Sequence, residues 1–158
     1  MVIALFSREI NDSTKNVINS FFLSNHAKHS KFFIEKNILD VLENTEDLNL
    51  IPFETSNDLD SSIDIMVSIG GDGTFLRCIE FIRELDIPVM GINTGNLGFL
   101  ATSKKENIKD SISKIFDKDF NVENRTLIKV NSDEIGINDY VFPCALNEVS
   151  VVRKDTTS

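Results

Sequence analysis

The sequence predicts an α/β fold, a Rossmann-like parallel sheet with crossover helices. Apolar runs with the two-residue period of strands alternate with runs that have the period of helices. The clearest strand run, 63–69, ends at a glycine pair, and the helical run after it leads through Pro88 into another apolar strand. Such a unit is normally a right-handed crossover in a parallel sheet, whose ligands gather at the carboxyl ends of the strands.

The elements follow one another without repeats or low-complexity tracts. Period-two alternation and apolar runs predict strands at 2–6, 31–35, 63–69, 88–92, 122–130 and 141–153. Helical spacing predicts helices that start near Asp12, run through Ile38 to Leu42, from Phe75 to Leu85, and from Ile108 to Phe116. The acidic, asparagine-rich run 43–60 predicts a solvated loop.

Composition limits the classes of function. The chain has 158 residues, 41% hydrophobic and 26% charged, which is enough for one globular domain or one domain and part of another. Its net charge of −9 disfavours nucleic acid as a partner, and no apolar run is as long as a membrane span. Cys78 and Cys144 are far apart, which indicates reduced thiols in a cytoplasmic protein.

The glycine turn after strand 63–69 suggests phosphate chemistry. Gly70, Gly71 and Gly73 allow backbone N–H groups to approach an anion at the start of the next helix. Asp72 would repel phosphate, so we expect it to face a hydroxyl, orient it and accept its proton during phosphoryl transfer. In the alternative, Asp72 caps the helix and the glycines only form a tight turn.

Commoner phosphate loops are excluded, and a second glycine loop follows. The sequence contains no G-x-x-x-x-G-K-[ST], and Leu76 stands where the dinucleotide fingerprint has its third glycine. After strand 88–92, Gly91, Gly95 and Gly98 imply close backbone packing or close approach of a ligand.

Three motifs together resemble the amino-terminal part of bacterial NAD kinases. They are GGDGT at 70–74, GINTGNLGFL at 91–100 and LNEV at 146–149. The first is shared with diacylglycerol and sphingosine kinases and, more loosely, with phosphofructokinases, whereas the second and third distinguish NAD kinases from them.

The resemblance implies transfer of the terminal phosphoryl group of ATP, or of polyphosphate, to the adenosine ribose 2′-hydroxyl of NAD. NADP is the product, and a divalent metal ion such as magnesium accompanies ATP. Asp72 matches the proton acceptor. The implied binding residues are Gly71, Asp72, Gly73, Leu76, Arg77, Phe99, Asn147, Glu148 and Ser158. The sequence shows no protein ligand set for a metal.

Two of these assignments have a structural alternative. Arg77 could reach a phosphate or form a surface pair with Glu80 or Glu84. Asn147 and Glu148 could bind an adenine edge and ribose hydroxyls, or be a loop asparagine and an exposed glutamate. Neighbouring strand residues point to opposite faces, so we expect a bulge or a strand end at this pair.

The resemblance also implies how the chain is organised. We expect an α/β domain over 1–120 and, over 121–158, the beginning of a β-rich dinucleotide-binding domain. Family members continue further, and their Gly-Asp-Gly and Thr-Gly-Ser-Thr segments have no counterpart here, so we expect an inactive or weakly active fragment of a protein that is homo-oligomeric at full length. The alternatives are a lipid-type kinase that shares only GGDGT, although no apolar or basic membrane-binding surface segment is evident, and a non-catalytic nucleotide-binding module.

Overall fold

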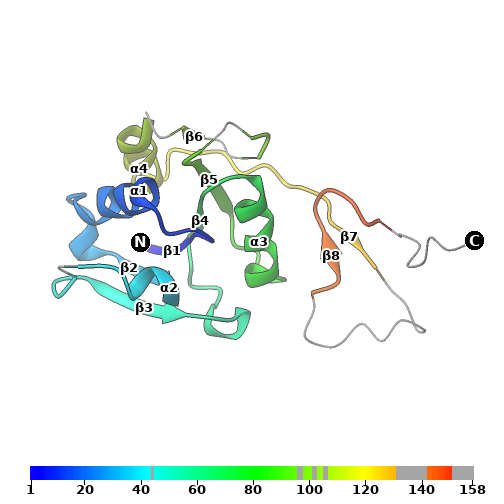
Figure 1. The fold of residues 1–158 in the computed structure, drawn as a ribbon, viewed down its shortest axis with the longest axis horizontal. Helices are drawn as coiled ribbons and strands as arrows, with labels where there is room; N and C mark the ends of the chain where they lie inside the picture. Colours follow the sequence, from blue (N-terminus) through cyan, green and yellow to red (C-terminus); the bar gives the residue numbers. More distant parts are fainter. Residues whose placement is uncertain (44, 96–97, 101–102, 105–106, 131–141, 151–158) are drawn as a thin grey trace, which may run out of the picture. The chain divides into compact units, whose positions relative to one another are not determined.

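A parallel sheet forms the core of the larger part of the molecule. A computed structural model describes residues 1–43, 45–95, 98–100, 103–104, 107–130 and 142–150. The chain divides into two compact units, Met1–Asn121 and Val122–Ser158. In the described part of the first unit, six strands pair in parallel in the order β3-β2-β1-β4-β5-β6 (Figure 1).

The helices and strands have the following bounds. The strands are β1 (Val2–Phe6), β2 (Lys31–Glu35), β3 (Asn49–Phe53), β4 (Ile65–Ile69), β5 (Val89–Asn93), β6 (Ser103–Lys104), β7 (Ile128–Lys129) and β8 (Cys144–Ala145). The α-helices are α1 (Asp12–Phe22), α2 (Lys36–Leu39), α3 (Asp72–Ile82) and α4 (Ile108–Phe116), with short 3₁₀ turns at Ala27–His29 and Ser56–Asp58. The predicted parallel sheet with crossover helices is confirmed.

Alternate residues of the strands face two separate hydrophobic clusters. In β1, Ile3 and Leu5 join the cluster that contains the apolar faces of α1 and α4, whereas Ala4 and Phe6 join the cluster beside α3. Both faces of the sheet are therefore covered, with α1 and α4 on one side and α3 on the other (Figure 1).

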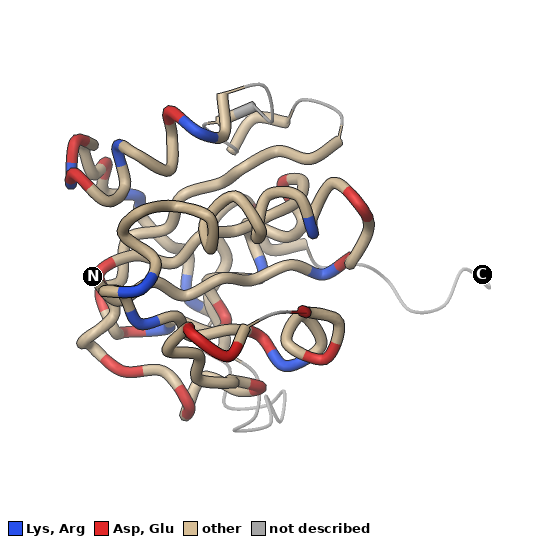
Figure 2. The backbone as a smooth tube through the Cα atoms, turned by 90° about the vertical axis from the view of Figure 1, so that its left-hand side faces the viewer, with Lys and Arg blue, Asp and Glu red and all other residues tan. Residues whose placement is uncertain are grey.

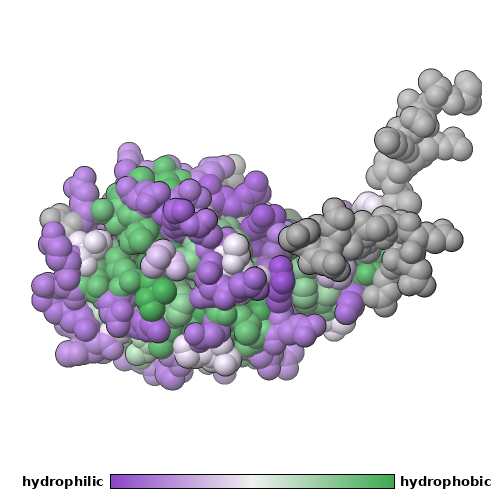
Figure 3. Space-filling model, turned by 90° about the horizontal axis from the view of Figure 1, so that it is seen from below, coloured by the Kyte–Doolittle hydropathy of each residue, from purple (hydrophilic) through white to green (hydrophobic). Residues whose placement is uncertain are grey.

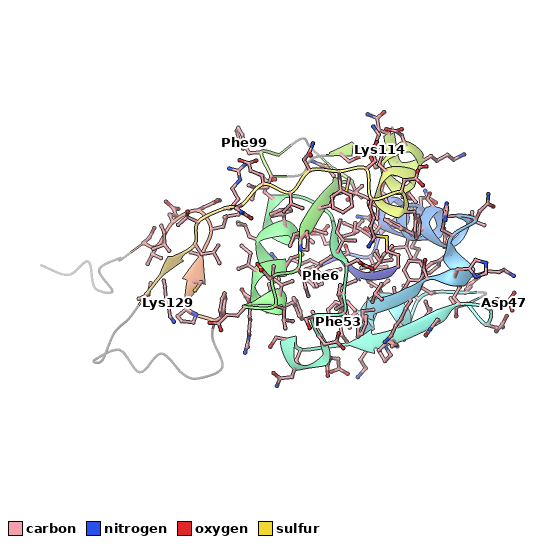
Figure 4. All side chains as sticks on the ribbon, turned by 180° about the vertical axis from the view of Figure 1, so that it is seen from behind. Phe6, Asp47, Phe53, Phe99, Lys114 and Lys129 are labelled. Carbon is pink, nitrogen blue, oxygen red and sulfur yellow. The ribbon has the colours of Figure 1, made fainter. Side chains whose placement is uncertain are left out.

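Three phenylalanine rings pack against one another in the cluster beside α3. The ring of Phe81 lies 4.9 Å from that of Phe6 and 5.4 Å from that of Phe53, measured between centroids. Figure 4 shows Phe6 and Phe53 inside the first unit. Outside this core the surface is mixed, and the face in Figure 3 shows polar residues around apolar ones, as is usual for a globular domain.

The predicted solvated loop over 43–60 is wrong for residues 49–53. Asn49–Phe53 forms strand β3, which pairs with β2 at the edge of the sheet, and Phe53 is buried. An edge strand tolerates Pro52 because one of its sides needs no N–H donor. The proline and the acidic flanks hid this strand from pattern analysis.

The two long strands predicted near the end of the chain are also corrected. Among the described residues of 122–130 and 141–153, only Ile128–Lys129 and Cys144–Ala145 are strands, and they pair with each other in antiparallel fashion. The pair has no further strand beside it in the described part of the chain, and an isolated two-stranded ribbon is marginal. Among the described residues, regular pairing therefore extends over two residues on each strand.

Asp64 fastens the amino end of β4 to the amino end of β1. Its carboxylate accepts hydrogen bonds from the Val2 backbone N–H (2.8 Å) and from the Lys118 ammonium (3.0 Å). Burial raises the pKa of this carboxyl, but these hydrogen bonds outweigh burial, and the net effect is a pKa below the ordinary value of 3.8.

The order of the strands identifies one special position at the opposite, carboxyl edge. From β1 the chain passes to α1 and β2 on one side, and from β4 it passes to α3 and β5 on the other. The connections therefore diverge between β1 and β4. In open α/β sheets, ligands bind at such a switch point, outside the carboxyl ends of the strands.

Candidate active site

The first glycine after β4 is required by both conformation and space. Gly70 has a φ of +151°, a region that side chains rarely adopt. A Cβ at this position would lie 2.5 Å from Oγ1 and 3.0 Å from Cβ of Thr74, which is buried in the first turn of α3. The turn from strand to helix therefore depends on glycine here.

Helix α3 begins without a side-chain cap. Its N-cap residue is Gly71, whose carbonyl accepts from the N–H groups of Thr74 (3.0 Å) and Phe75 (3.2 Å). The alternative in which Asp72 caps this helix is therefore wrong, because Asp72 lies inside the first turn. Its negative charge still has a favourable position at the helix amino end.

The carboxylate of Asp72 contacts the second glycine loop. Oδ2 accepts from the backbone N–H of Phe99 (2.8 Å), and Oδ1 accepts from that of Leu100 (3.0 Å). These donors come 27 and 28 residues later in the chain. The carboxylate thus joins the GGDGT turn to the loop that follows β5, and the two motifs lie side by side at the carboxyl edge.

Gly98 makes this contact possible. A Cβ at residue 98 would lie 2.5 Å from Cγ and 2.7 Å from Oδ2 of Asp72, and closer still to Oδ1. Gly98 does not have a positive φ, so the requirement is one of space rather than of backbone conformation. The predicted close packing in this loop is confirmed at Gly98, whereas a Cβ at Gly95 would meet nothing within 4 Å.

The other residues from the GGDGT and GNLGFL motifs have different surroundings. The side chain of Phe99 is fully exposed, and Figure 4 shows its ring at the periphery of the first unit. Leu76 is half-buried. The guanidinium of Arg77 pairs with the carboxylate of Glu80 at 2.6 Å, which is the surface pair that the sequence offered as an alternative.

The third motif belongs to the second unit. Asn147 and Glu148 follow the end of β8 and are exposed, so the expected strand end lies just before them. Ser158 lies outside the described residues.

Buried polar groups support the loops at this edge. Asn93, at the end of β5, is buried, and its Oδ1 accepts from the Gly95 N–H (2.8 Å). Ser7, after β1, is buried and donates from Oγ to the carbonyl of Ile69 (2.7 Å). Pattern analysis passed over both, because short polar residues after a strand are common and only the strand order shows which strands end together.

The charges and possible metal ligands of the described residues limit the kinds of ligand and partner that this part of the chain could bind. In the described part of the chain, no group of three or more His, Cys, Asp or Glu side chains could hold a metal ion, and no helix has the length and apolarity to cross a membrane. Basic and acidic residues are interspersed along the chain rather than sorted into one basic stripe (Figure 2).

Cys78 and Cys144 are both free, and burial raises the pKa of the Cys78 thiol to about 12.

Comparison with known proteins gives one consistent result. Residues 13–120 match the family model described as the ATP-NAD kinase N-terminal domain. A protein named NAD kinase from Flavobacterium psychrophilum is 39% identical over 162 aligned residues, and one from Flavobacterium johnsoniae is 34% identical over 160. Each alignment covers 100% of this chain and 54% of the relative, so the chain spans about half the length of these relatives.

A solved structure shares the fold. A crystal structure of yeast NADH kinase complexed with NADH superposes with a TM-score of 0.60 at 18% identity, covering 74% of this chain and 36% of that one.

Proposed function

Because the chain belongs to the ATP-NAD kinase family, we propose that it supplies the catalytic acid–base residue of an enzyme that phosphorylates NAD. The reaction is transfer of the terminal phosphoryl group of ATP, or of polyphosphate, to the 2′-hydroxyl of the adenosine ribose. The products are NADP and ADP, or a polyphosphate shortened by one unit.

The position of the Asp72 carboxylate carries this proposal. It lies at the carboxyl edge of the sheet, on the first turn of a helix that starts with glycines, and two backbone N–H groups fix both of its oxygens. An ionised carboxylate only accepts hydrogen bonds, so a hydroxyl placed beside it would direct its O–H toward an Oδ atom. The arrangement is suited to holding a hydroxyl in one orientation.

In the proposed step one bond forms, one bond breaks and one proton moves. A lone pair of the ribose 2′-oxygen attacks the terminal phosphorus, the bond from that phosphorus to the leaving ADP oxygen breaks, and the hydroxyl proton passes to Asp72. The backbone N–H groups of the glycine turn and the start of α3 favour the negative charge of the phosphates. No described cluster fits a resident metal ion, so magnesium would enter with the phosphate oxygens of ATP and would supply charge neutralisation there.

Other residues are proposed to bind the dinucleotide. Phe99, whose backbone N–H binds Asp72, offers an exposed ring, and Leu76, four residues after Asp72 on α3, offers a half-buried apolar side chain. Gly71 and Gly73 allow close approach of the backbone, and Asn147 and Glu148 offer an amide and a carboxylate for adenine and ribose. We also propose a cytoplasmic location, because the two cysteines are free thiols. At full length we propose a homo-oligomer.

The test is NADP formation by wild-type protein and by Asp72→Asn. Because the relatives are about twice as long, the assay uses the 158-residue chain and a chimera that continues with the carboxyl-terminal half of the Flavobacterium psychrophilum protein. Mass spectrometry follows NAD incubated with ATP and magnesium.

We expect NADP from the chimera and a loss of about 10²–10⁴-fold in kcat on Asp72→Asn, with KM for NAD changed much less. An Asp72→Asn chimera with undiminished turnover would remove the proton-acceptor role. Phosphorylation of diacylglycerol or sphingosine in place of NAD would favour the lipid-kinase alternative, and nucleotide binding without turnover would favour a binding module.

A further inference from the structure

Arg8 follows β1 directly, at the switch point of the sheet. The hydroxyl of Ser7 donates to the carbonyl of Ile69, the last residue of β4, and also lies 2.8 Å from the carbonyl of Glu9. Ser7 is buried, so this bond is shielded from water. The backbone at Arg8 is therefore tied to the strand that leads into the glycine turn.

The side chain of Arg8 reaches that turn. Its Nη1 lies 3.7 Å from the position that a Cβ would occupy at Gly73, so the guanidinium lies against the bare backbone beside Asp72. Arg8 is exposed and takes part in none of the ion pairs among the described residues. Acids are not scarce, since the chain has 25 Asp and Glu against 16 Lys and Arg.

Arg77, the other arginine near this turn, does take part in an ion pair. It pairs with Glu80 and is partly neutralised. Arg8 thus places beside the turn that the proposed reaction uses a guanidinium that forms no ion pair with any described residue.

We propose that Arg8 is a phosphate-binding residue for the phosphoryl donor. This inference rests on the proposed function and adds a group to it. A guanidinium presents a planar fork of N–H donors that matches two phosphate oxygens, and it keeps its charge throughout, so Arg8 gains and loses no proton. The glycine turn and Arg8 would hold the donor phosphates from two strands, while Asp72 orients the acceptor hydroxyl. Fixed positive charge at the transferred group stabilises the transition state.

The experiment measures binding to the 158-residue chain and needs no turnover. Tripolyphosphate, ATP, NAD and adenosine are titrated into wild type, Arg8→Ala, Arg8→Lys and Lys28→Ala, with calorimetry and the NMR signal of the arginine Nε–H groups as readouts. Lys28 pairs with Asp47 before β2, at the amino edge, so Lys28→Ala removes one positive charge away from the site.

We expect Arg8→Ala to weaken tripolyphosphate and ATP binding about tenfold or more, Arg8→Lys to recover part of the loss, and Lys28→Ala to change little. Tripolyphosphate and ATP should shift the Arg8 Nε–H signal, and adenosine should not. Equal ATP affinity of wild type and Arg8→Ala overturns the inference, as does a loss confined to NAD or a wild type that binds no ATP at millimolar concentration. The kinase proposal is judged separately, by NADP formation and its dependence on Asp72.

Discussion

Replacing Gly98 with alanine should displace the Asp72 carboxylate. The added Cβ would lie 2.5 Å from Cγ of Asp72, whereas carbon atoms pack best at about 3.5–4.0 Å, so one of the two groups must move by about 1 Å or more. That movement breaks the hydrogen bonds from Phe99 and Leu100, which are 2.8 and 3.0 Å long.

The loss of stability caused by the steric overlap can be separated from the effect that any Gly→Ala change has on the backbone. Overpacking of this kind typically costs about 1–3 kcal/mol in free energy of unfolding. In an Asp72→Ala background the overlapping atoms are absent, so Gly98→Ala should cost about 0.5 kcal/mol or less. The difference is a coupling energy of about 0.5–3 kcal/mol between the two positions.

Urea unfolding of the wild type, both single variants and the double variant measures this coupling. Gly95→Ala is the matched control, because a Cβ at Gly95 would meet nothing within 4 Å and Gly95, like Gly98, has no positive φ. It should change the free energy of unfolding by about 0.5 kcal/mol or less. If Gly98→Ala costs the same with and without the Asp72 carboxylate, the steric argument fails. In the chimera, a shift of this size should also lower kcat about 10²-fold.

Three further predictions concern stability and reactivity. Gly70→Ala should destabilise by about 1–3 kcal/mol because of its φ of +151° and its overlap with Thr74, with a drop in thermal midpoint as the measurement; an unchanged midpoint would contradict the strain argument. Because the pKa of Asp64 is lowered in the folded state, its contribution to stability is present above the ordinary value of 3.8 and is lost as pH falls through the folded-state pKa. In urea unfolding from pH 6 to pH 2, Asp64→Asn should therefore lose less free energy of unfolding than wild type as the pH falls. Parallel curves for the two proteins would refute this assignment. A thiol reagent at pH 8 should modify Cys144 readily and Cys78 only on unfolding, since burial raises the pKa of the Cys78 thiol to about 12; rapid labelling of both thiols in the folded protein would disagree.

The sequence by itself determined most of the α/β unit. Strand β1 and strand β2 have their predicted bounds, because a strand that is buried between two layers needs an apolar run and little else. The GGDGT turn was predictable for a related reason, since a tight turn between a buried strand and a helix limits the residues that can occupy it. Motif resemblance then identified the family.

The edges of the sheets were decided by tertiary contacts. Strand β3 is held by β2 on one side and by burial of Phe53, and neither is visible in a polar stretch that contains Pro52. Within the described residues, β7 and β8 pair over two residues each, and a period-two pattern does not show where such pairing begins and ends.

Only the tertiary structure decided how the candidate site is assembled. The order of the strands brings the end of β1 beside the end of β4, and this places Arg8 against Gly73. Packing of the two glycine loops directs Asp72 to the N–H groups of Phe99 and Leu100 rather than to its own helix. Local sequence specifies which residues can turn or carry charge, but contacts between residues far apart in the chain depend on loop closure and packing, which the complete fold determines.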